Sequence, residues 1–486
     1  MKIVKRILFA LAALLLVFIS VVAVRTITFK SNQTTDVKPM EKLKLSESKI
    51  VNHLSQAIRY KTVSYTDPDL FNYDEFDKLI RYIEQAFPKT HKVLKREIVN
   101  KHSLLYTWEG TDKALKPIVL IAHMDVVGVE KETEKDWIHG PFSGEVADGK
   151  IWGRGARDNK SQVMSALEAI EYLLANNFTP KRTIYIAFGH DEEVLGVNGA
   201  EKIAQLLKSR KIKPDCVIDE GGAIQKNAVP GIKGNVALIG TGEKGYLTLR
   251  LSVNAEGGHS STPSKNTSVG ILSRAIVRLD NNKFSSSLIG VKPMLEYAAS
   301  YMKFPYNVMA SNLWATGGII KKVMAASPDT NAMIRTTGVV TIYSGGFKDN
   351  VIPSYASVVM NFRLLPGDTT VSVIKHVKKV INDSRVKISV TGFNNNPPPV
   401  SSVKTKSFKI LQTSIKQVFP DTICVPYLVT GGTDSKHYAV LTPNLYRFTP
   451  SIKEKDEESH GINERIPIKN YKQYIAYYIQ MIKNFQ

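Results

Sequence analysis

Histidines and carboxylates recur at five separate places in the chain, after apolar runs or inside loops. These places are His123 with Asp125, Asp158, the run 190–193, Asp219 with Glu220, and His460. Two imidazoles with several carboxylates are ligands that suit zinc or a similar divalent ion. Two ions about 3.5–4 Å apart can activate a shared water and polarise a carbonyl group, so the set indicates metal-assisted hydrolysis.

Asp158 lies in the segment 153–160, where Gly153 and Gly155 allow backbone conformations that are closed to residues with a Cβ atom. The apolar spacing of residues 163–174 predicts a helix after this loop. An aspartate before a helix is usually an N-cap. Because four other candidate ligand groups accompany it, we expect that Asp158 instead bridges two metal ions.

Two of the other groups directly follow predicted strands. Residues two apart on a strand face the same side, so Asp125 can reach His123, fix its tautomer and raise its basicity. Glu192 and Glu193 follow the strand expected at 183–188. Beside a bound dication, one of these glutamates can bind the ion while the other takes a proton from bound water. Taken alone, each group would be an ordinary solvated charge at a strand end.

Alternating strands and helices position these groups. Strands are expected at 118–122, 183–188 and 216–218, and helices at 163–174 and 199–209. This alternation predicts an α/β fold with a mostly parallel sheet and helices on both faces. Ligands of such folds gather beyond the carboxyl ends of the strands, which is where the candidate residues lie.

The pattern changes after residue 244. Residues 246–253, 268–279, 338–343, 357–364, 370–381 and 386–390 follow the order β, α, β, β, α, β. This is the split ferredoxin-like order, so we expect residues 245–393 to form an inserted α+β domain. The α/β domain would then consist of residues 46–244 and 400–486, with 394–399 as the return linker. Residues 283–331 are expected to be an irregular insertion.

Residues 1–29 form a basic and then apolar segment. Lys2, Lys5 and Arg6 precede residues 7–24, which carry no charge and are just long enough to cross a membrane. A signal peptide usually has a shorter apolar region, so an uncleaved anchor is favoured. The basic flank keeps the N-terminus cytoplasmic. The rest of the chain then lies outside the cytoplasm, in a single-pass membrane protein or, after cleavage, in a secreted or periplasmic one. Polar residues 30–45 are expected to be a linker.

Composition narrows the class of protein. The formal charge of +21 is large, but the lysines are scattered and no nucleic-acid motif or basic-aromatic interleaving occurs. A solvated surface or an affinity for anionic membranes is therefore favoured over nucleic-acid binding. Two cysteines, Cys216 and Cys424, exclude a disulfide framework, and their apolar surroundings indicate buried thiols.

From about Ser46 to the C-terminus, the order of these motifs resembles the aminoacylase/carboxypeptidase S family of co-catalytic zinc metallopeptidases. It is most similar to the branch of yeast carboxypeptidase S and the mammalian secreted N-fatty-acyl-amino-acid hydrolase/synthase. The resemblance implies two zinc ions, with cobalt or manganese as alternatives. The implied metal ligands are His123 and Asp219 for one ion, Glu193 and His460 for the other, and Asp158 as the bridge.

The resemblance also implies the remaining roles. Asp125 would orient His123, and Glu192 would be the general base. A cis peptide would join Asp158 to Asn159. Of the pair Asp219 and Glu220, Glu220 is the less favoured ligand, and His190, which has no implied role, is expected to be structural.

The inserted domain matches the family's lid or dimerisation domain, which implies a homodimer. His259, in Gly-Gly-His-Ser-Ser, would stabilise the oxyanion, although alone it would be an ordinary polar residue. Asn350 and Arg363 match positions that contact substrate, and a guanidinium suits a free carboxylate. Gly432 lies in the matching loop Gly-Gly-Thr-Asp-Ser beside the metals.

Two activities follow from the resemblance. The first is hydrolysis of short peptides with a free C-terminal carboxylate, and the alternative is hydrolysis or synthesis of N-fatty-acyl amino acids. A non-catalytic relative is the competing class. Such a protein would be expected to lose the base or a ligand, whereas every one of them is present, including Glu192.

Overall fold

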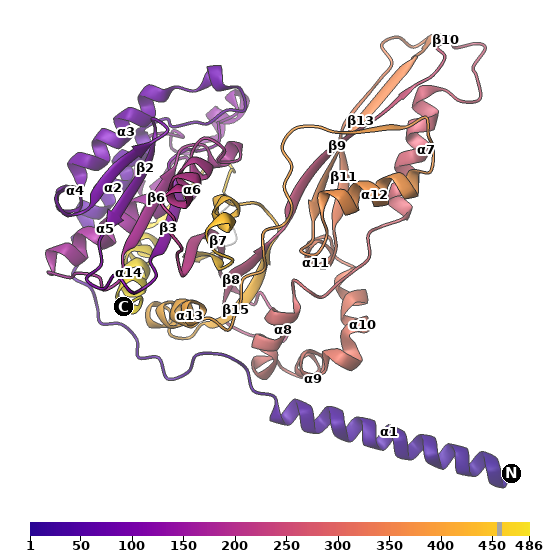
Figure 1. Cartoon of the computed structure of the whole chain (residues 1–486), viewed down its shortest axis with the longest axis horizontal. Helices are drawn as coiled ribbons and strands as arrows, with labels where there is room; N and C mark the ends of the chain where they lie inside the picture. The colour runs from indigo at the N-terminus through magenta and orange to yellow at the C-terminus, as the bar shows by residue number, and fades with distance from the viewer. Residues whose placement is uncertain (454–458) are drawn as a thin grey trace.

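An eight-stranded sheet carries most of the candidate ligands (Figure 1). The computed structural model describes residues 1–453 and 459–486. The strand order is β1-β2-β6-β3-β7-β16-β8-β15. Their bounds are β1 (Lys95–Val99), β2 (Ser103–Trp108), β3 (Ile118–His123), β6 (Ile184–Gly189), β7 (Cys216–Lys226), β8 (Asn235–Glu243), β15 (Ile423–Val429) and β16 (Leu445–Ile452).

The sheet is mostly parallel, as predicted. The pairs β3–β6, β3–β7, β7–β16 and β8–β15 are parallel, while the β1–β2 hairpin and β2–β6 are antiparallel. Strands β1, β2, β8 and β16 were not predicted. The central strand β3 is buried at every position, which is typical of a strand covered on both faces.

Helices cover both faces of this sheet. On one face α5 (Lys160–Ala175) packs against α14 (Ile468–Asn484), with α2 (Glu47–Arg59) and α13 (Lys406–Val418) beside them. On the other face α6 (Ala200–Ser209) and the 3₁₀ turn η5 (Asp434–Val440) cover a second core. The remaining peripheral elements are η1 (Pro68–Leu70), α3 (Tyr73–Ala86), α4 (Pro88–Val93), η2 (Lys131–Asp136) and η3 (Glu192–Val194).

A small sheet brings the C-terminal loop to the Asp158 loop. Its order is β17 (Arg465–Pro467), β5 (Lys150–Trp152) and β4 (Val146–Ala147). Arg465 pairs with Trp152, so the segment that carries His460 lies beside the loop that begins at Gly153.

The second domain has the predicted ferredoxin-like order. Its antiparallel sheet is β11-β13-β9-β14, made of β9 (Gly245–Asn254), β11 (Thr337–Gly345), β13 (Tyr355–Leu364) and β14 (Lys387–Val390). Helices α7 (Ser268–Asn281) and α12 (Thr370–Ile381) pack on this sheet around a separate core. At the far tip a two-stranded sheet joins β10 (Gly258–His259) to β12 (Val351–Ile352) (Figure 1).

The expectation of an irregular insertion at 283–331 was wrong. The segment forms α8 (Lys292–Ala298), η4 (Ala299–Tyr301), α9 (Tyr306–Ser311), α10 (Leu313–Met324) and α11 (Pro328–Ile334). These helices pack on the α/β domain, where α8 contacts β15. Most are too short to show a helical period in sequence. We call residues 292–334 the helical insertion.

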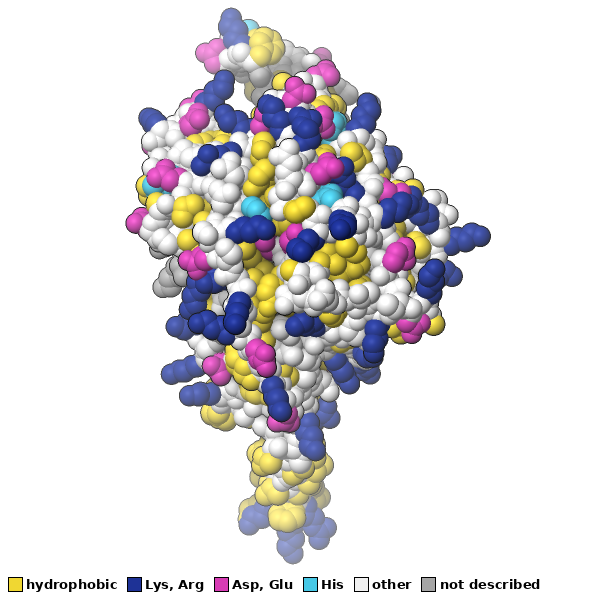
Figure 2. Space-filling model, turned by 90° about the vertical axis from the view of Figure 1, so that its left-hand side faces the viewer, with side chains coloured by type: hydrophobic (Ala, Val, Ile, Leu, Met, Phe, Trp, Pro, Cys, Tyr) yellow, Lys and Arg dark blue, Asp and Glu magenta, His cyan; other side chains and the backbone are white. Residues whose placement is uncertain are grey.

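The N-terminal helix α1 (Lys2–Thr28) extends away from the body and has no buried residue (Figure 1). It is the one helix among the described residues that is long and apolar enough to cross a membrane, and a signal sequence would have the same properties. Its apolar surface ends in a group of basic side chains (Figure 2). On the body, lysines and arginines are interspersed with acidic residues over the face that Figure 2 shows.

A buried ion pair joins two strands beneath the site and yields a stability prediction. Arg447 Nε donates to Glu243 Oε2 at 2.8 Å, and both side chains are 0% exposed. Arg447→Met would leave Glu243 charged without its partner, so we expect a loss of about 3–5 kcal/mol in the free energy of unfolding. Urea denaturation followed by tryptophan fluorescence measures it.

The matched control breaks a surface pair. Arg210 donates to Glu97 at 2.8 Å at the edge of the sheet. Arg210→Met should cost about 1 kcal/mol or less, because solvent screens this pair. If Arg447→Met and Arg210→Met lower the free energy of unfolding by the same amount, the buried pair does not stabilise the fold more than the surface pair.

Candidate metal centre

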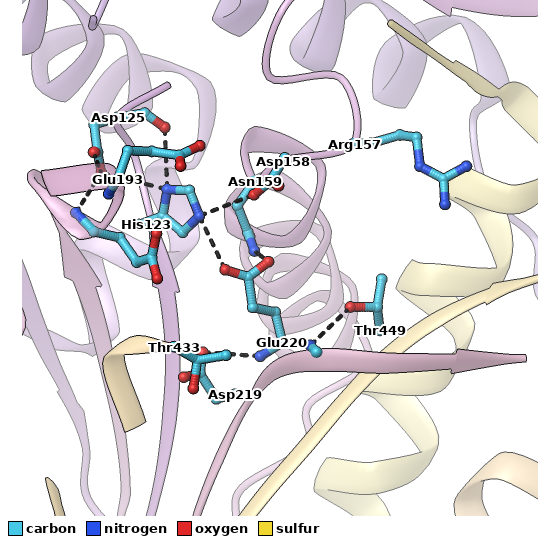
Figure 3. A network of polar contacts seen from close by, with 12 residues as sticks. His123, Asp125, Arg157, Asp158, Asn159, Glu193, Asp219, Glu220, Thr433 and Thr449 are labelled. Carbon is cyan, nitrogen blue, oxygen red and sulfur yellow. Dashed lines mark hydrogen bonds and ion pairs between the residues drawn. The ribbon is translucent and has the colours of Figure 1, made fainter. Parts of the chain in front are cut away.

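The candidate ligands come together beyond the carboxyl ends of β3 and β6, beside the middle of β7 (Figure 3). His123 is the last residue of β3, and Glu192 and Glu193 begin the turn after β6. The loop before α5 brings Asp158, and the loop before β17 brings His460. Among the described residues, three groups of potential ligand atoms result: His123 with Asp158 and Glu220, Asp158 with Glu193 and His460, and His123 with Glu192 and Glu193.

Asp158 lies between the two histidines. Its Oδ1 atom is 3.1 Å from His123 Nε2, and its Oδ2 atom is 3.3 Å from His460 Nε2. Burial alone would raise the pKa of Asp158, but hydrogen bonds from the two imidazoles hold it well below its usual range. The peptide bond from Asp158 to Asn159 is cis. The carboxylate therefore has the orientation that a bridge between two cations needs.

His123 is almost fully buried and surrounded by acceptors. Its Nδ1 atom donates to the backbone carbonyl of Asp125 at 3.1 Å, which directs Nε2 toward Asp158 and Glu220. Burial opposes the charged ring, yet the carboxylates of Glu220, Asp125 and Asp158 raise its pKa well above the ordinary value. The pocket thus favours a positive charge at Nε2, which a metal ion can supply.

His460 and Glu193 form the second half of the cluster. His460 Nε2 is 3.1 Å from Glu193 Oε1, and hydrogen bonds with Asp158 and Glu193 raise the pKa of His460 to about 10. Burial raises the pKa of Glu193 to about 7. Two imidazoles and three carboxylates therefore surround the space around Asp158, a donor set that fits two zinc ions.

Glu220, and not Asp219, lies beside His123, which corrects the expectation from sequence. Glu220 Oε1 is 3.0 Å from His123 Nε2, and Asn159 Nδ2 donates to the other oxygen of Glu220. The Asp219 carboxylate instead accepts from the backbone N–H groups of Glu220 at 2.8 Å and Ser435 at 2.7 Å. Adjacent residues of a strand point to opposite faces, and the sequence does not show which of the two faces the cluster.

Asp125 has a second task that the sequence did not reveal. Its two carboxylate oxygens accept from the backbone N–H groups of Glu192 and Glu193, each at 3.1 Å, and Ser64 Oγ donates to it at 2.7 Å. The carboxylate also lies 3.3 Å from His123 Nδ1, so it both faces the histidine and holds the turn that carries the two glutamates. Burial raises the pKa of Glu192 well above its ordinary value.

Glu464 holds the loop of Asp158 and was missed. Its Oε1 accepts from the backbone N–H groups of Gly155, Arg157 and Asp158 at 2.8–3.1 Å. Its other oxygen pairs with Arg154 at 2.7 Å. Glu464 is 2% exposed, but in the sequence it is a single acid beside polar residues, so no local pattern could have identified it.

A cavity of about 230 Å³ adjoins the two glutamates and contains two of the predicted substrate-side residues. Arg363 and Gly432 line it together with Glu192 and Glu193. Lys244, which was not predicted, also lines it, and its Nζ donates to the backbone carbonyls of Ala332, in the helical insertion, and of Arg335, directly after it, each at 3.0 Å. Three cationic residues, Lys244, Arg363 and Lys436, thus line the cavity that Glu192 and Glu193 border.

His259 and Asn350 are not brought to the cluster within one chain. Both lie at the tip of the second domain, far from β3 and β7 in Figure 1. His259 is exposed there, and its Nδ1 atom is 2.7 Å from Ser261 Oγ. Asn350 is also exposed and accepts from the Ser260 backbone N–H through its carbonyl at 3.2 Å.

His190 has the structural environment that was expected of it. It is 3% exposed, and Ser103 Oγ lies 2.6 Å from its Nδ1 atom. Burial lowers the pKa of His190 to about 4, so its ring is neutral near neutral pH.

Comparison with known proteins shows the family to which the chain is similar. The family model described as peptidase family M20/M25/M40 matches residues 119–484. A probable carboxypeptidase S-like 2 of Dictyostelium discoideum is 42% identical over 446 residues, covering 90% of this chain and 86% of the relative. The N-fatty-acyl-amino acid synthase/hydrolase PM20D1.1 of Danio rerio is 39% identical over 498 residues, covering 98% and 95%.

Solved structures share the fold. The M20 family metallo-carboxypeptidase Sso-CP2 of Sulfolobus solfataricus superposes with a TM-score of 0.65 at 20% identity, covering 91% of this chain and 99% of that one. Human carnosine dipeptidase 1 superposes with a TM-score of 0.59 at 16% identity, covering 90% and 97%.

The contrast between Glu220 and Asp219 can be tested by metal content. Glu220→Ala removes a carboxylate oxygen next to His123 Nε2, so we expect a purified variant to lose one of two zinc ions per chain in elemental analysis. Asp219→Asn keeps an oxygen for one of the two backbone donors, does not alter the Glu220 carboxylate, and should retain both ions. Loss of an ion from Asp219→Asn but not from Glu220→Ala would make Asp219 the ligand. Thermal unfolding checks that both variants are folded.

Proposed function

The chain belongs to peptidase family M20/M25/M40 and is a metallopeptidase or amidohydrolase of it, and we propose that it uses two metal ions to cleave amides that release a free amino acid. The position of Asp158 carries this function, since each of its carboxylate oxygens faces a different histidine. Zinc is the metal expected for this donor set, with cobalt or manganese as alternatives.

Five side chains would hold the two ions. His123 and Glu220 would bind one, Glu193 and His460 would bind the other, and Asp158 would bind both. When bound, two such ions lower the pKa of a shared water and polarise the amide carbonyl. Asp125 would fix the tautomer of His123 through the hydrogen bond at Nδ1, and Glu464 would keep the Asp158 loop in place.

Glu192 would be the general base. It is part of the same turn as Glu193, borders the cavity, and has a pKa that burial raises, so it can accept the proton of the attacking water. It would then deliver that proton to the nitrogen of the leaving amino acid, because the same carboxyl group remains next to both atoms.

Arg363 would hold the α-carboxylate of the substrate. Its guanidinium group reaches the cavity beside Glu192 and stacks on Tyr246, with 4.5 Å from Cζ to the ring centroid. A planar guanidinium offers two parallel donors to a carboxylate. Lys244 and Lys436 add positive charge to the lining of the same cavity, which favours anionic over neutral substrates.

His259 and Asn350 would act in a homodimer. They lie at the tip of the second domain and cannot serve the metal cluster of their own chain in this arrangement. The tip of a second copy could bring His259 to the oxyanion and Asn350 to the substrate.

An apolar cavity favours the N-acyl-amino-acid activity over the dipeptidase activity. It has a volume of about 380 Å³ and lies between the helical insertion and the sheet. Five of the eleven methionines of the chain line it, namely Met294, Met302, Met309, Met324 and Met333. Methionine side chains adapt to hydrocarbon of varied shape. A fatty acyl chain is the kind of group that such a cavity would take.

The two cavities have no lining residue in common, but α11 connects them. Helix α11 lines the apolar cavity through Thr330 and Met333. The backbone carbonyls of Ala332 and Arg335, at the end of α11, accept hydrogen bonds from Lys244, which lines the cavity beside Glu192 and Glu193 (the metal-side cavity). An acyl amino acid could therefore place its carboxylate near Arg363 and its acyl chain toward the helical insertion. We further propose that α1 anchors the enzyme with its α/β domain outside the cytoplasm, secretion after cleavage being the alternative.

Replacing the base tests the activity itself. Glu192→Gln should lower turnover by about 10²–10⁴-fold, because it removes proton transfer and leaves the ligand set intact. Release of amino acid from dipeptides and from long-chain N-acyl amino acids would be measured with and without a chelator, along with metal content. Turnover that survives in this variant with full metal content would remove Glu192 from the role of base.

Filling the apolar cavity tests the acyl substrate. Met324→Trp should displace about two methylene groups of a long acyl chain, which corresponds to about 1.6 kcal/mol and about a tenfold fall in kcat/KM. N-acetyl amino acids should be unaffected. The matched control is Ala326→Trp, since Ala326 is exposed nearby and does not line the cavity. If Met324→Trp lowers kcat/KM equally for short and long acyl groups, the acyl chain of the substrate does not enter this cavity.

A further inference from the structure

Helix α10 has an unusual surface for an exposed helix. Its sequence, Leu-Trp-Ala-Thr-Gly-Gly-Ile-Ile-Lys-Lys-Val-Met, is apolar around most of its circumference, yet Ile320 is its one buried residue. A helix that is hydrophobic all round normally lies in a protein core or in a membrane. Trp314, Ile319 and Val323 are each more than half exposed. Water is therefore an unfavourable environment for this helix.

The preceding segment extends the same apolar surface. Phe304, between η4 and α9, is 80% exposed, and Tyr301 and Tyr306 are exposed beside it. We call these three residues together with Trp314, Ile319 and Val323 the apolar face. Exposed contiguous apolar side chains commonly mark the sites where proteins contact other molecules or membranes.

Helix α1 is bonded to this part of the body. Arg25 Nε donates to the carbonyl of Ser311 at 3.0 Å, and Asn312 Nδ2 donates to Thr26 Oγ1 at 2.9 Å. Further along α1, Phe18 packs edge-on against Trp314 with 5.6 Å between ring centroids. The last three turns of α1 thus lie against α9 and α10.

The linker after α1 is also fixed, so the body cannot easily move away from the helix. Ser31 Oγ donates to the carbonyl of Tyr297 at 2.6 Å, and Gln33 Oε1 accepts from the Cys424 backbone N–H at 3.1 Å. The position of α1 in a membrane would therefore determine where α10 lies.

The length of α1 determines how deep in the bilayer each of its residues would lie. Its uncharged part, residues 7–24, is about 27 Å long at about 1.5 Å per residue, which nearly equals the hydrocarbon thickness of about 30 Å. Phe18 lies six residues before the end of that part, or about 9 Å below the outer boundary of the hydrocarbon. Trp314, whose ring centroid is 5.6 Å from that of Phe18, would then lie in the outer part of the bilayer, close to the interface where tryptophans are enriched.

Basic residues border the apolar face. Lys303 and Lys322 are exposed, and Lys321 is half-buried next to Ile320. Lysines beside an apolar surface suit the anionic headgroups of a bilayer.

From these contacts we propose that the apolar face rests in the outer interface of the bilayer that α1 spans, with Trp314 at the boundary between headgroups and acyl chains. The occupant of this face is phospholipid, and the body is seated on the membrane rather than held away from it by a flexible linker. Since this seating depends on the membrane insertion of α1 proposed above, the test must report on each separately.

The chain offers a direct spectroscopic probe. It has four tryptophans, and Trp108, Trp137 and Trp152 are each less than 9% exposed in the α/β domain. The full chain would be reconstituted into vesicles of phosphatidylcholine and phosphatidylserine, with or without bromine atoms in the upper acyl chain, which quench tryptophan at short range. We expect brominated lipid to reduce the emission of the natural chain and to leave Trp314→Phe unchanged.

A control variant moves the probe to the second domain. Tyr343, on β11, is 46% exposed, so Trp314→Phe combined with Tyr343→Trp keeps four tryptophans and should show no quenching. Ile319→Asp with Val323→Asp should reduce the quenching of Trp314, because carboxylates oppose entry into the interface.

Flotation of the vesicles separates the two hypotheses. If the natural chain floats with the vesicles and Trp314 is not quenched, α1 is inserted but the seating of the body is wrong. If the chain does not float with the vesicles at all, both the membrane insertion of α1 and the seating of the body on the membrane are wrong. The Ile319→Cys variant tests a second copy of the chain as the occupant. If it forms a disulfide-linked dimer and Trp314 is not quenched, the apolar face contacts a second copy and the lipid proposal is wrong.

Discussion

The contacts of Asp158 with two histidines are the constraint on which the candidate site depends. A carboxylate can face both His123 and His460 only if the loop before α5, the end of β3 and the loop before β17 meet at one point. Around that point Glu193 and Glu220 have pKa values raised to about 7, largely because they are buried. So many acids can share a buried space only when positive charge is present, and two divalent ions would supply it.

Carboxylates that are not ligands keep the ligand loops in position. Asp125 accepts from the backbone of Glu192 and Glu193, Glu464 from the Asp158 loop, and Asp219 from Glu220 and Ser435. Each anchors backbone N–H groups that would otherwise be buried without a partner, and each thereby fixes the direction of a side chain in the cluster. The site is thus built from two kinds of acid, those that face the metals and those that hold the backbone.

The helical insertion connects parts of the molecule that seem unrelated in sequence. Its first helix packs on β15, its last binds Lys244 in the metal-side cavity, and α9 and α10 contact α1. The apolar cavity lies beneath the same helices. An enzyme that acts on acyl amino acids would benefit from this arrangement, because the membrane, the acyl cavity and the carboxylate-binding wall would follow one another in space.

The sequence by itself determined the fold class and most of the site. Apolar runs of strand length alternating with helical periods specify a parallel α/β sheet, and acids placed directly after such runs lie at its carboxyl edge. For this reason His123, Asp125, Glu192 and Glu193 could be identified before the fold was known, whereas Asp158, in a loop before a helix, was identified by the other candidate ligands of the chain. The ferredoxin-like order of the second domain could also be predicted from local patterns. Short strands and helices with no full period, such as β16 and the helical insertion, gave no such signal.

Only the tertiary structure decided which atoms face one another. The twist of β7 turns Glu220 toward His123 and Asp219 toward Ser435, although the two acids are neighbours in sequence. Pairing of β17 with β5 puts Glu464 under the Asp158 loop across some 300 positions of chain. The length of the second domain places His259 far from the cluster of its own chain. Side-chain direction and long-range contact depend on the packing of the whole chain, which local patterns of residue type do not contain.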